Sequence, residues 1–317
     1  MKYSQSFFLK HRLVIMNISR DLLVAEPGQR LNTIEHYIKK FHVSRGTIQM
    51  AMQYLIEKGC ISTQFCGHLG TFLLTKNMDK LWEFAGIGNL TGAMPIPLDK
   101  MSSGLATGVC DCMRAKRIPF NCIFIHGSNA RVKSLLQGKC DFVVVTRLAH
   151  EVLKKTHNNI KLIINLTDCR YTTKYALLFK DPGKSKIENG MTVAIDPTSI
   201  DQSYLTKLAC KKRKSIQFIQ TPSFLNTRLS VAKGEADVSV VIYSAAQSLG
   251  TKFQAQIKEI QLSEYNNDDL ELLRTPVILV LKDNYGLDAL LKQTLDAGVI
   301  FNSQKAVMAG TILPNYY

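Results

Sequence analysis

The sequence predicts a small, mainly helical N-terminal domain followed by a larger α/β domain made of two similar lobes. Capped amphipathic helices and a Gly-containing hairpin predict the first domain, and a helix–turn–strand unit that occurs twice predicts the second. The chain has 317 residues, of which 46% are hydrophobic and 21% are charged. These values fit two folded domains and exclude a disordered or collagen-like chain.

Charge and cysteine usage limit the partners and the compartment. The 40 Lys and Arg against 25 Asp and Glu give a net charge of +15, which favours an anionic partner such as nucleic acid, a membrane surface or an acidic metabolite. The eight cysteines form no CxxC pair, so we expect buried free thiols rather than disulfides or a zinc site. Without a signal-peptide pattern or an apolar stretch of about 20 residues, we expect a cytoplasmic protein with no membrane partner, metal or cofactor.

Two helices are expected before residue 42. An amphipathic helix is predicted over Ser4–Val24 and is followed by a break at Glu26–Gly28. The second helix is predicted to begin at Asn32, with Glu35 three residues later, which is the spacing of a capping box.

A third helix and a hairpin complete the first domain. Ser44 is the expected cap of a helix that runs to about Lys58, and two short strands are expected over Ile61–Leu74 around a turn at Gly67 and Gly70. Two short helices, a tight turn and a polar face on the second of them are the parts of a helix-turn-helix, and the hairpin adds a wing.

Three motifs of this domain, Val43–Ile48, Leu55–Ile61 and Gly70–Phe72, resemble the winged helix of GntR-type regulators. The resemblance implies DNA binding, and only Arg45 is kept among the usual basic contacts. The candidate DNA-binding residues are the polar residues of the third helix and the positions where GntR-type domains usually carry arginine: Ser44, Arg45, Thr47, Gln49, His36 and His68. Residues 1–76 carry ten Lys and Arg against four Asp and Glu, a net +6 that favours DNA. The alternative is a winged helix used only for protein contacts or dimerisation.

The repeated unit defines the second domain, in which we expect mostly parallel strands. Gly138–Asp141 follows a predicted helix and precedes the predicted strand Phe142–Thr146. Gly234–Asp237 likewise follows a predicted helix and precedes the predicted strand Val238–Ile242. Glycine suits the left-handed position at a helix end, and we expect each Asp to be a turn residue rather than a ligand. Two matching units predict two similar α/β lobes.

This repeated unit resembles the type 2 periplasmic-binding-protein fold, which also forms the effector domain of LysR-type regulators. The resemblance implies a ligand cleft between two lobes and two crossings of the chain, near Cys169–Tyr175 and Thr275–Val280. A polar linker is expected at Lys76–Asp79. The expected domains are 1–76 and 80–317, with lobe one about 80–170 plus 276–317 and lobe two about 171–275.

The order of the two modules resembles the YhfZ family of transcriptional regulators. The segments Gly86–Pro97 and His126–Leu135 strengthen this resemblance, which spans nearly the whole chain. It implies a regulator and does not name a ligand.

Candidate ligand-binding residues lie at predicted helix N-termini and strand ends, because free backbone N–H groups and the helix dipole favour anions there. They are Ser102, Ser103, Ser128, Asn129, Arg131, Thr146, Arg147, Thr198, Ser199 and Tyr243. Each Ser or Thr has an ordinary helix cap as its alternative. Arg131 and Arg147 could clamp an anion or form surface salt bridges.

The sequence therefore predicts a ligand-responsive, DNA-binding transcriptional regulator. We expect a homodimer that binds double-stranded DNA and a small anionic effector. No Walker loop, Gly-x-Ser-x-Gly elbow or HExxH motif is present, so no enzyme is expected. The alternative is a small-molecule-binding α/β protein or enzyme whose winged helix serves only assembly.

Overall fold

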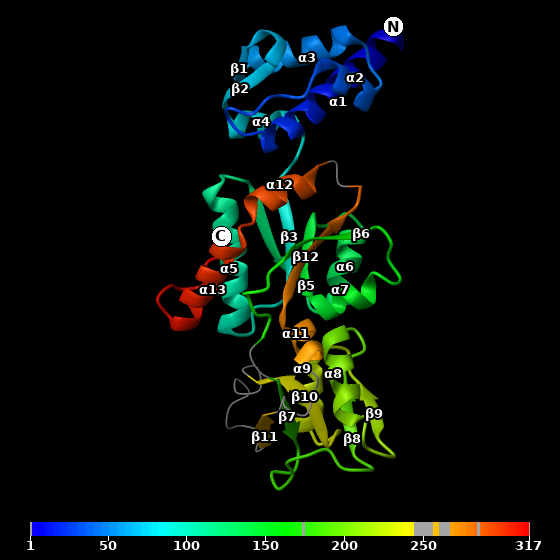
Figure 1. Ribbon diagram of the computed structural model, residues 1–317. Helices are drawn as coiled ribbons and strands as arrows, with labels where there is room; N and C mark the ends of the chain where they lie inside the picture. Colours follow the sequence, from blue (N-terminus) through cyan, green and yellow to red (C-terminus); the bar gives the residue numbers. More distant parts are fainter. Residues whose placement is uncertain (1, 173–174, 244–255, 260–266, 284–285, 317) are drawn as a thin grey trace. The chain divides into compact units, whose positions relative to one another are not determined.

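The computed structural model describes residues 2–172, 175–243, 256–259, 267–283 and 286–316 (Figure 1). The chain divides into two compact units. Unit 1 comprises Met1–Leu90, Ala115–Pro119 and Asp283–Thr294, and unit 2 comprises Thr91–Arg114, Phe120–Lys282 and Leu295–Tyr317. In the described part of the chain, no helix is both long and apolar enough to cross a membrane.

Unit 1 begins with the three predicted helices, α1 (Lys2–Val24), α2 (Ile34–Phe41) and α3 (Arg45–Glu57). The cap of α3 is confirmed, because Ser44 Oγ accepts a hydrogen bond from Thr47 N at 3.3 Å. The capping box on α2 is wrong by one residue, since Thr33 Oγ1 accepts from His36 N at 3.2 Å. The chain before α2 is still paired with the hairpin, where Leu31 N donates to Thr71 O, so the helix begins one residue later than expected.

The predicted hairpin is confirmed as β1 (Ile61–Phe65), a 3-10 turn η1 (Gly67–Leu69) and β2 (Thr71–Lys76). Residues 76–79, expected to be a linker, instead end β2 and begin α4 (Met78–Ala85). Asn77 caps α4 through a 3.1 Å bond from Lys80 N. The last helix of this unit, α12 (Leu287–Thr294), packs against α1.

Unit 2 contains two five-stranded sheets, which we call lobe one and lobe two together with their helices. Lobe one has the strand order β4-β3-β5-β12-β6. Its strands are β3 (Leu90–Met94), β4 (Phe120–Phe124), β5 (Phe142–Thr146), β6 (Ile160–Asn165) and β12 (Pro276–Leu281). Its helices are α5 (Lys100–Ala115), α6 (Ser128–Leu136), α7 (Arg147–Leu153) and α13 (Ala297–Ala309).

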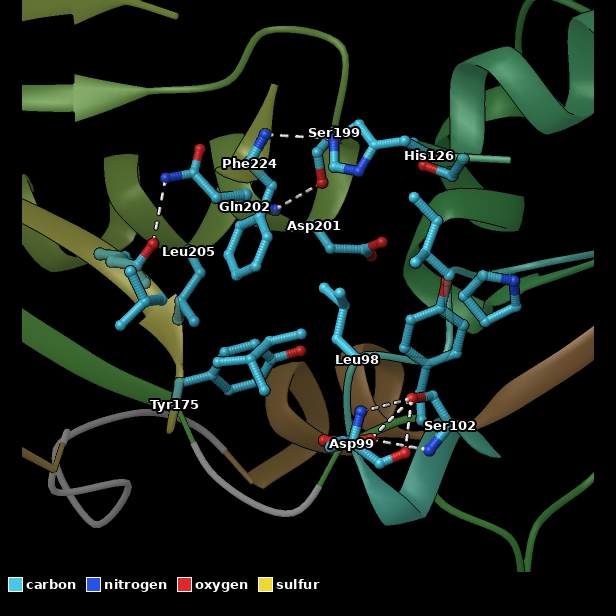
Figure 2. Close-up of a pocket in the computed structure, with 18 of the residues that line it drawn as sticks. Leu98, Asp99, Ser102, His126, Tyr175, Ser199, Asp201, Gln202, Leu205 and Phe224 are labelled. Carbon is cyan, nitrogen blue, oxygen red and sulfur yellow. Dashed lines mark hydrogen bonds between the residues drawn. The ribbon is translucent and has the colours of Figure 1, made fainter. Parts of the chain in front are cut away.

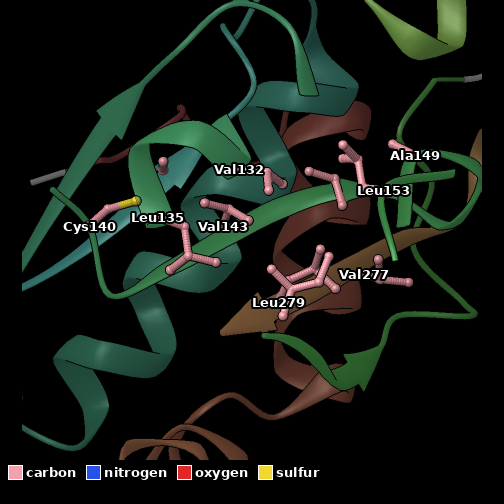
Figure 3. Close-up of a cluster of buried hydrophobic side chains, with 11 residues drawn as sticks. Val132, Leu135, Cys140, Val143, Ala149, Leu153, Val277 and Leu279 are labelled. Atoms are coloured by element: carbon pink, nitrogen blue, oxygen red, sulfur yellow. The ribbon is translucent and has the colours of Figure 1, made fainter. Parts of the chain in front are cut away.

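The core of lobe one lies between α6, α7 and the central strands of its sheet (Figure 3). Val132 and Leu135 of α6 contact a cluster that includes Val143 of β5 and Val277 and Leu279 of β12, and all five side chains are buried. Burying one such side chain contributes about 1.5–3 kcal/mol, so this cluster holds α6 firmly on the sheet.

Lobe two has the strand order β11-β7-β10-β8-β9. Its strands are β7 (Tyr175–Phe179), β8 (Thr192–Ile195), β9 (Gln217–Gln220), β10 (Val238–Ile242) and β11 (Gln256–Glu259), and its helices are α8 (Ile200–Cys210), α9 (Phe224–Ala232) and α11 (Asn267–Arg274). The chain passes from β6 to β7 and returns from α11 to β12, at the two expected crossings. Residues 173 and 174 of the first crossing lie outside the described residues.

The sheets are mixed rather than mostly parallel. β12 runs antiparallel to both β5 and β6, and β7 runs antiparallel to β10 and β11. These strands adjoin the crossings, so they enter their sheets from the other lobe instead of through a helix of the same lobe.

The doubled Gly-x-x-Asp unit has the same role in both lobes. Asp141 Oδ2 accepts a hydrogen bond from Thr91 N at 2.7 Å, and Asp237 Oδ2 accepts one from Thr192 N at 2.8 Å. Each carboxylate thus joins the turn before one central strand to the start of the neighbouring strand: β5 to β3 in lobe one, and β10 to β8 in lobe two. The structural role of these aspartates is confirmed.

Candidate ligand pocket and DNA-binding face

A cavity of about 90 Å³ lies between the two lobes of unit 2 (Figure 2). Most of its wall is apolar and comes from both lobes: Pro95, Ile96, Leu98, Tyr171, Tyr175, Leu205, Phe224 and Val240–Ile242. Its polar wall is formed by Asp99, Ser102, His126, Ser128, Arg131, Ser199, Asp201 and Gln202. A concave, mainly apolar wall with a few polar groups is typical of a small-molecule site.

Two of the three helix N-termini expected at this cavity are already capped. Asp99 Oδ1 accepts from Ser102 N at 2.8 Å at the start of α5. Ser199 Oγ accepts from Gln202 N at 3.3 Å at the start of α8. These capping bonds use the helix N–H groups that a ligand would otherwise bind.

The N-terminus of α6 differs from these two. Its N-cap is Gly127, which has no side chain to cap the helix, and Ser128 Oγ is buried with no hydrogen-bond partner among the described residues. Gly127 has φ +78°, and a Cβ there would lie 3.1 Å from Thr198 O of lobe two. Glycine therefore allows the start of α6 to lie close to lobe two. Ser128 therefore does not cap α6, so the helix-cap alternative considered for it is wrong.

Arg131 of α6 is held firmly at the cavity wall. Its Nε donates to Val144 O at 2.9 Å, Nη1 to Ile125 O at 2.7 Å and Nη2 to Tyr171 Oη at 2.6 Å. Its side chain is buried, with the residue 2% exposed. These bonds use one hydrogen on each guanidinium nitrogen, and each Nη atom has a second one.

Asp201 brings a carboxyl group to the same cavity from α8 of lobe two. The Thr146 hydroxyl donates to Asp201 Oδ1 across the lobe boundary. Burial raises the pKa of Asp201 to about 6, while the Thr146 bond and the charge of Arg131 act to lower that pKa. The cavity thus contains one fixed cation and one carboxyl group that ionises reluctantly.

His126, which follows β4, contacts lobe two through one ring nitrogen. Nε2 lies 3.0 Å from Asp196 Oδ2 and 3.1 Å from Phe224 N. The Asp196 carboxylate is buried, and hydrogen bonds from His126 and Thr198 lower its pKa although burial alone would raise it. Figure 2 shows His126 beside the backbone of Phe224, joined to it by this hydrogen bond.

The ten expected ligand residues separate into two groups. Ser102, Ser128, Arg131 and Ser199 line the cavity. The other six lie outside the lining: Ser103, Asn129, Thr146, Arg147, Thr198 and Tyr243. The Thr146 hydroxyl caps α7 and donates to Asp201, and the Thr198 hydroxyl donates to Asp196, so both hydroxyls already have partners within the protein. Arg147 is exposed on the surface.

Sequence reasoning missed several lining residues, chiefly His126, Asp201, Gln202 and the aromatic side chains of Tyr171, Tyr175 and Phe224. Asp201 lies two residues after the expected cap Ser199, so the expected helix placed it nearby. The two tyrosines lie on the predicted crossing. No local signal marks His126, because its partners are 70 and 98 residues away.

The helix-turn-helix presents most of its expected DNA-contacting residues on the surface. Ser44, Arg45 and Gln49 of the α3 region are exposed, as are His36 of α2 and His68 of the wing turn, while Thr47 is half-buried. The Arg45 guanidinium pairs with the Glu35 carboxylate, and both side chains are largely exposed. Glu35 therefore contacts Arg45 instead of completing a capping box.

A further basic residue lies beside the wing. Arg30 forms an isolated β-bridge with Phe72, and its guanidinium lies over Gly70, where a Cβ would be 2.8 Å from Arg30 Nε. Gly70 has φ +94°, so glycine suits this turn for two reasons. Arg30 precedes the wing by about forty residues in sequence, and the β-bridge and the contact with Gly70 show that the two are neighbours.

The fold and the cavity together define a helix-turn-helix protein with a two-lobed domain of the periplasmic-binding-protein type. Residues 26–73 match a helix-turn-helix domain family, and residues 77–316 match the YhfZ C-terminal domain family. The chain belongs to the YhfZ family.

Known relatives agree with this assignment. The chain is 27% identical over 313 residues to YhfZ of Escherichia coli strain K12, covering 98% of this chain and 99% of that protein. The crystal structure of YhfZ from Shigella flexneri matches with a TM-score of 0.59 at 23% identity, over 75% of this chain and 97% of that one. The periplasmic VFT2 domain of Bordetella pertussis BvgS shares the fold, with a TM-score of 0.50 at 13% identity over 73% of this chain and 98% of that one.

Proposed function

We propose that this protein is a ligand-responsive transcriptional regulator that binds DNA through α3 and a small anionic metabolite through the cavity between its lobes. Ligand binding is supported by the uncapped N-terminus of α6, where the buried Ser128 hydroxyl lacks a partner among the described residues. DNA binding is supported by the helix-turn-helix domain.

The ligand binds by a polar end and an apolar body. The first-turn N–H groups of α6, the Ser128 hydroxyl and the second hydrogens of the Arg131 Nη atoms are donors, and helix N-termini favour negative charge. Phe224, Leu205 and Ile242 supply the apolar wall. A small carboxylate with a short hydrocarbon portion meets both conditions.

The DNA contact is made by the exposed polar face of α3. The helix lies in the major groove, with Arg45 and Gln49 toward the DNA and Arg30 and His68 at the wing. A homodimer supplies two helix-turn-helix domains, one for each of two DNA half-sites. Ligand binding favours the closed arrangement of the lobes, and this population shift changes the spacing of the two helix-turn-helix domains.

DNA binding is tested by the affinity of the purified full-length protein for duplex DNA over a range of salt concentrations. A protein that contacts about four phosphates loses affinity with a log–log slope of about −3.6. Arg45→Ala lowers affinity and makes the slope shallower by about 0.9, and the lobes keep their ligand response. No measurable duplex binding at low salt would favour the alternative, a small-molecule-binding protein whose winged helix serves only assembly.

Ligand binding is tested by thermal unfolding with a panel of small carboxylates, each paired with its uncharged amide. A ligand raises the unfolding midpoint by mass action, and we expect shifts with carboxylates but not with their amides. Ser128→Ala reduces the shift. Ser103→Ala, which changes a buried serine of α5 outside the cavity lining, is the matched control and keeps the shift. Equal shifts with carboxylates and amides would refute the anionic ligand.

A further inference from the structure

The exposed face of α3 carries almost no charge. Ile48, Ala51 and Leu55 are buried on one side of the helix, which fixes the side that is left to solvent. The exposed residues of that solvent side, which we call the reading face, are Gly46, Gln49, Met50, Gln53 and Glu57. These five residues include no lysine or arginine, so the reading face is neutral apart from one carboxylate at its end.

Arg45 lies beside the reading face. It is the only cation of α3, a helix that the structure describes in full, and helical spacing places it about a quarter of a turn from Gly46 and Gln53. Its guanidinium pairs with the Glu35 carboxylate of α2. A cation in this position suits a backbone phosphate, and phosphate contacts position a protein on the duplex without reading its sequence. Base recognition is therefore left to the reading face.

The side chains of the reading face match A·T base pairs. In the major groove, Arg and Lys pair with guanine, a Gln amide pairs with N6 and N7 of adenine, and apolar groups contact the thymine methyl. Gln49 supplies an amide, and Met50, which is 47% exposed, supplies an apolar group next to it. The reading face thus has partners for adenine and thymine and none of the cations that pair with guanine.

The residues on either side of Gln49 and Met50 limit the contact. A Cβ at Gly46 would lie 4.0 Å from Ser44 Oγ, an ordinary contact distance, so the missing side chain leaves the first turn open and lets the helix backbone approach the base edges. Gln53 Nε2 donates to Glu57 Oε1 at 3.0 Å, so this amide is already engaged near the acidic end of the helix. Gln49 and Met50 lie between these two positions.

We propose that α3 reads an A·T-rich half-site, in which Gln49 pairs with an adenine and Met50 packs against the thymine methyl of a neighbouring base pair. Gln49 Nε2 donates to adenine N7, and Gln49 Oε1 accepts from the adenine N6 amino group. This specificity rests on the proposed DNA binding, to which it adds the bases that the protein selects.

The first measurement is a selection from a library of random-sequence duplexes by the full-length protein at low salt, followed by sequencing of the bound duplexes. We expect neighbouring A·T pairs in the enriched half-sites. Half-sites dominated by G·C pairs, or bound duplexes without an enriched sequence, would overturn the proposed specificity and leave DNA binding intact. Failure to retain any duplex would overturn DNA binding itself, and this specificity with it.

Modified adenines in the selected duplex test the Gln49 contact. 7-Deazaadenine has a C–H group in place of N7, and losing that one hydrogen bond should weaken wild-type binding about 2- to 12-fold at one position. Gln49→Ala is exposed and keeps the fold, and it should lose the sensitivity at that position. Gln53→Ala, the same change one turn later, is the matched control and keeps it. Equal sensitivity in the wild type and Gln49→Ala would refute the contact.

Modified thymines test the Met50 contact in the same duplex. Uracil lacks the methyl group, and its loss should weaken wild-type binding about fourfold at one position. Met50→Ala should lose this sensitivity and keep the response to 7-deazaadenine. A wild-type protein that binds the uracil duplexes as tightly as the thymine duplex would refute the contact and assign Met50 to a protein interface instead.

A gain of specificity completes the test of Gln49. Because arginine pairs with O6 and N7 of guanine, Gln49→Arg should select guanine where the wild type selects adenine. A variant that failed to fold could not produce this change. Continued selection of adenine at that position by Gln49→Arg would show that residue 49 does not read the base.

Discussion

His126 Nε2 lies 3.0 Å from Asp196 Oδ2 and also 3.1 Å from the backbone nitrogen of Phe224. An unprotonated Nε2 accepts from the Phe224 N–H, and a protonated Nε2 donates to the Asp196 carboxylate. In both states the ring joins lobe one to lobe two at the cavity. A substitution at His126 therefore tests this contact between the lobes.

His126→Ala is expected to loosen the lobe contact. The Phe224 N–H loses its acceptor, and Asp196 keeps only its bonds from Thr198. Losing a hydrogen-bond partner of a buried group costs about 1–3 kcal/mol. We expect a lower free energy of unfolding and faster hydrogen exchange at Phe224. His157→Ala, a lobe-one histidine outside the cavity lining, is the control, and equal exchange in both variants would contradict this role.

Asp201→Asn is expected to change the pH dependence of stability. Burial raises the pKa of Asp201 to about 6, from an ordinary value of 3.8. Because the folded state then binds this proton more tightly than the unfolded state, the contribution of Asp201 to stability falls as the pH rises from about 4 to about 6. The variant lacks this fall. Chemical unfolding at several pH values measures the difference, with the exposed Asp168→Asn as control. A difference between wild type and Asp201→Asn that is constant with pH would refute the assignment.

Glu35→Gln is expected to strengthen DNA binding. The Glu35 carboxylate competes with phosphate for the Arg45 guanidinium and adds a negative charge beside the proposed DNA face. An exposed pair of this kind stabilises the fold by only about 0–1 kcal/mol, so the fold tolerates its loss. We expect a severalfold higher affinity in a titration at fixed salt. Glu57→Gln removes one negative charge at the other end of α3 and should give a smaller gain. Equal gains would show that Arg45 is not involved.

Gly108→Ala is expected to destabilise lobe one. A Cβ at this position of α5 would lie 2.6 Å from Ile300 Cα, which is backbone and cannot rotate away. Overpacking of this kind costs about 1–3 kcal/mol and outweighs the helix propensity gained by replacing glycine, about 1 kcal/mol. Gly88→Ala, which meets no atom within 4 Å, is the control and should be near neutral. Both free energies come from denaturant unfolding.

Local sequence predicted the features whose causes are local. The Ser44 cap depends on the backbone three residues later, and the Gly-x-x-Asp turns depend on a left-handed glycine followed by a buried strand. The cap of α2 was missed by one residue because Leu31 is held by Thr71, forty residues away. The sequence also treated Arg131 and Arg147 alike, although one is buried at the cavity and the other is exposed.

The sequence by itself determined the order of the modules, the capped helices, the hairpin and the doubled unit of the two lobes, because periodicity, caps and turns act over a few residues. Only the tertiary structure decided which helix N-terminus is left uncapped and which side chains meet across the lobes. Asp201 meets Thr146 and His126 meets Asp196 through the packing of two separate sheets. Such contacts depend on the relative placement of distant segments, which no local pattern encodes.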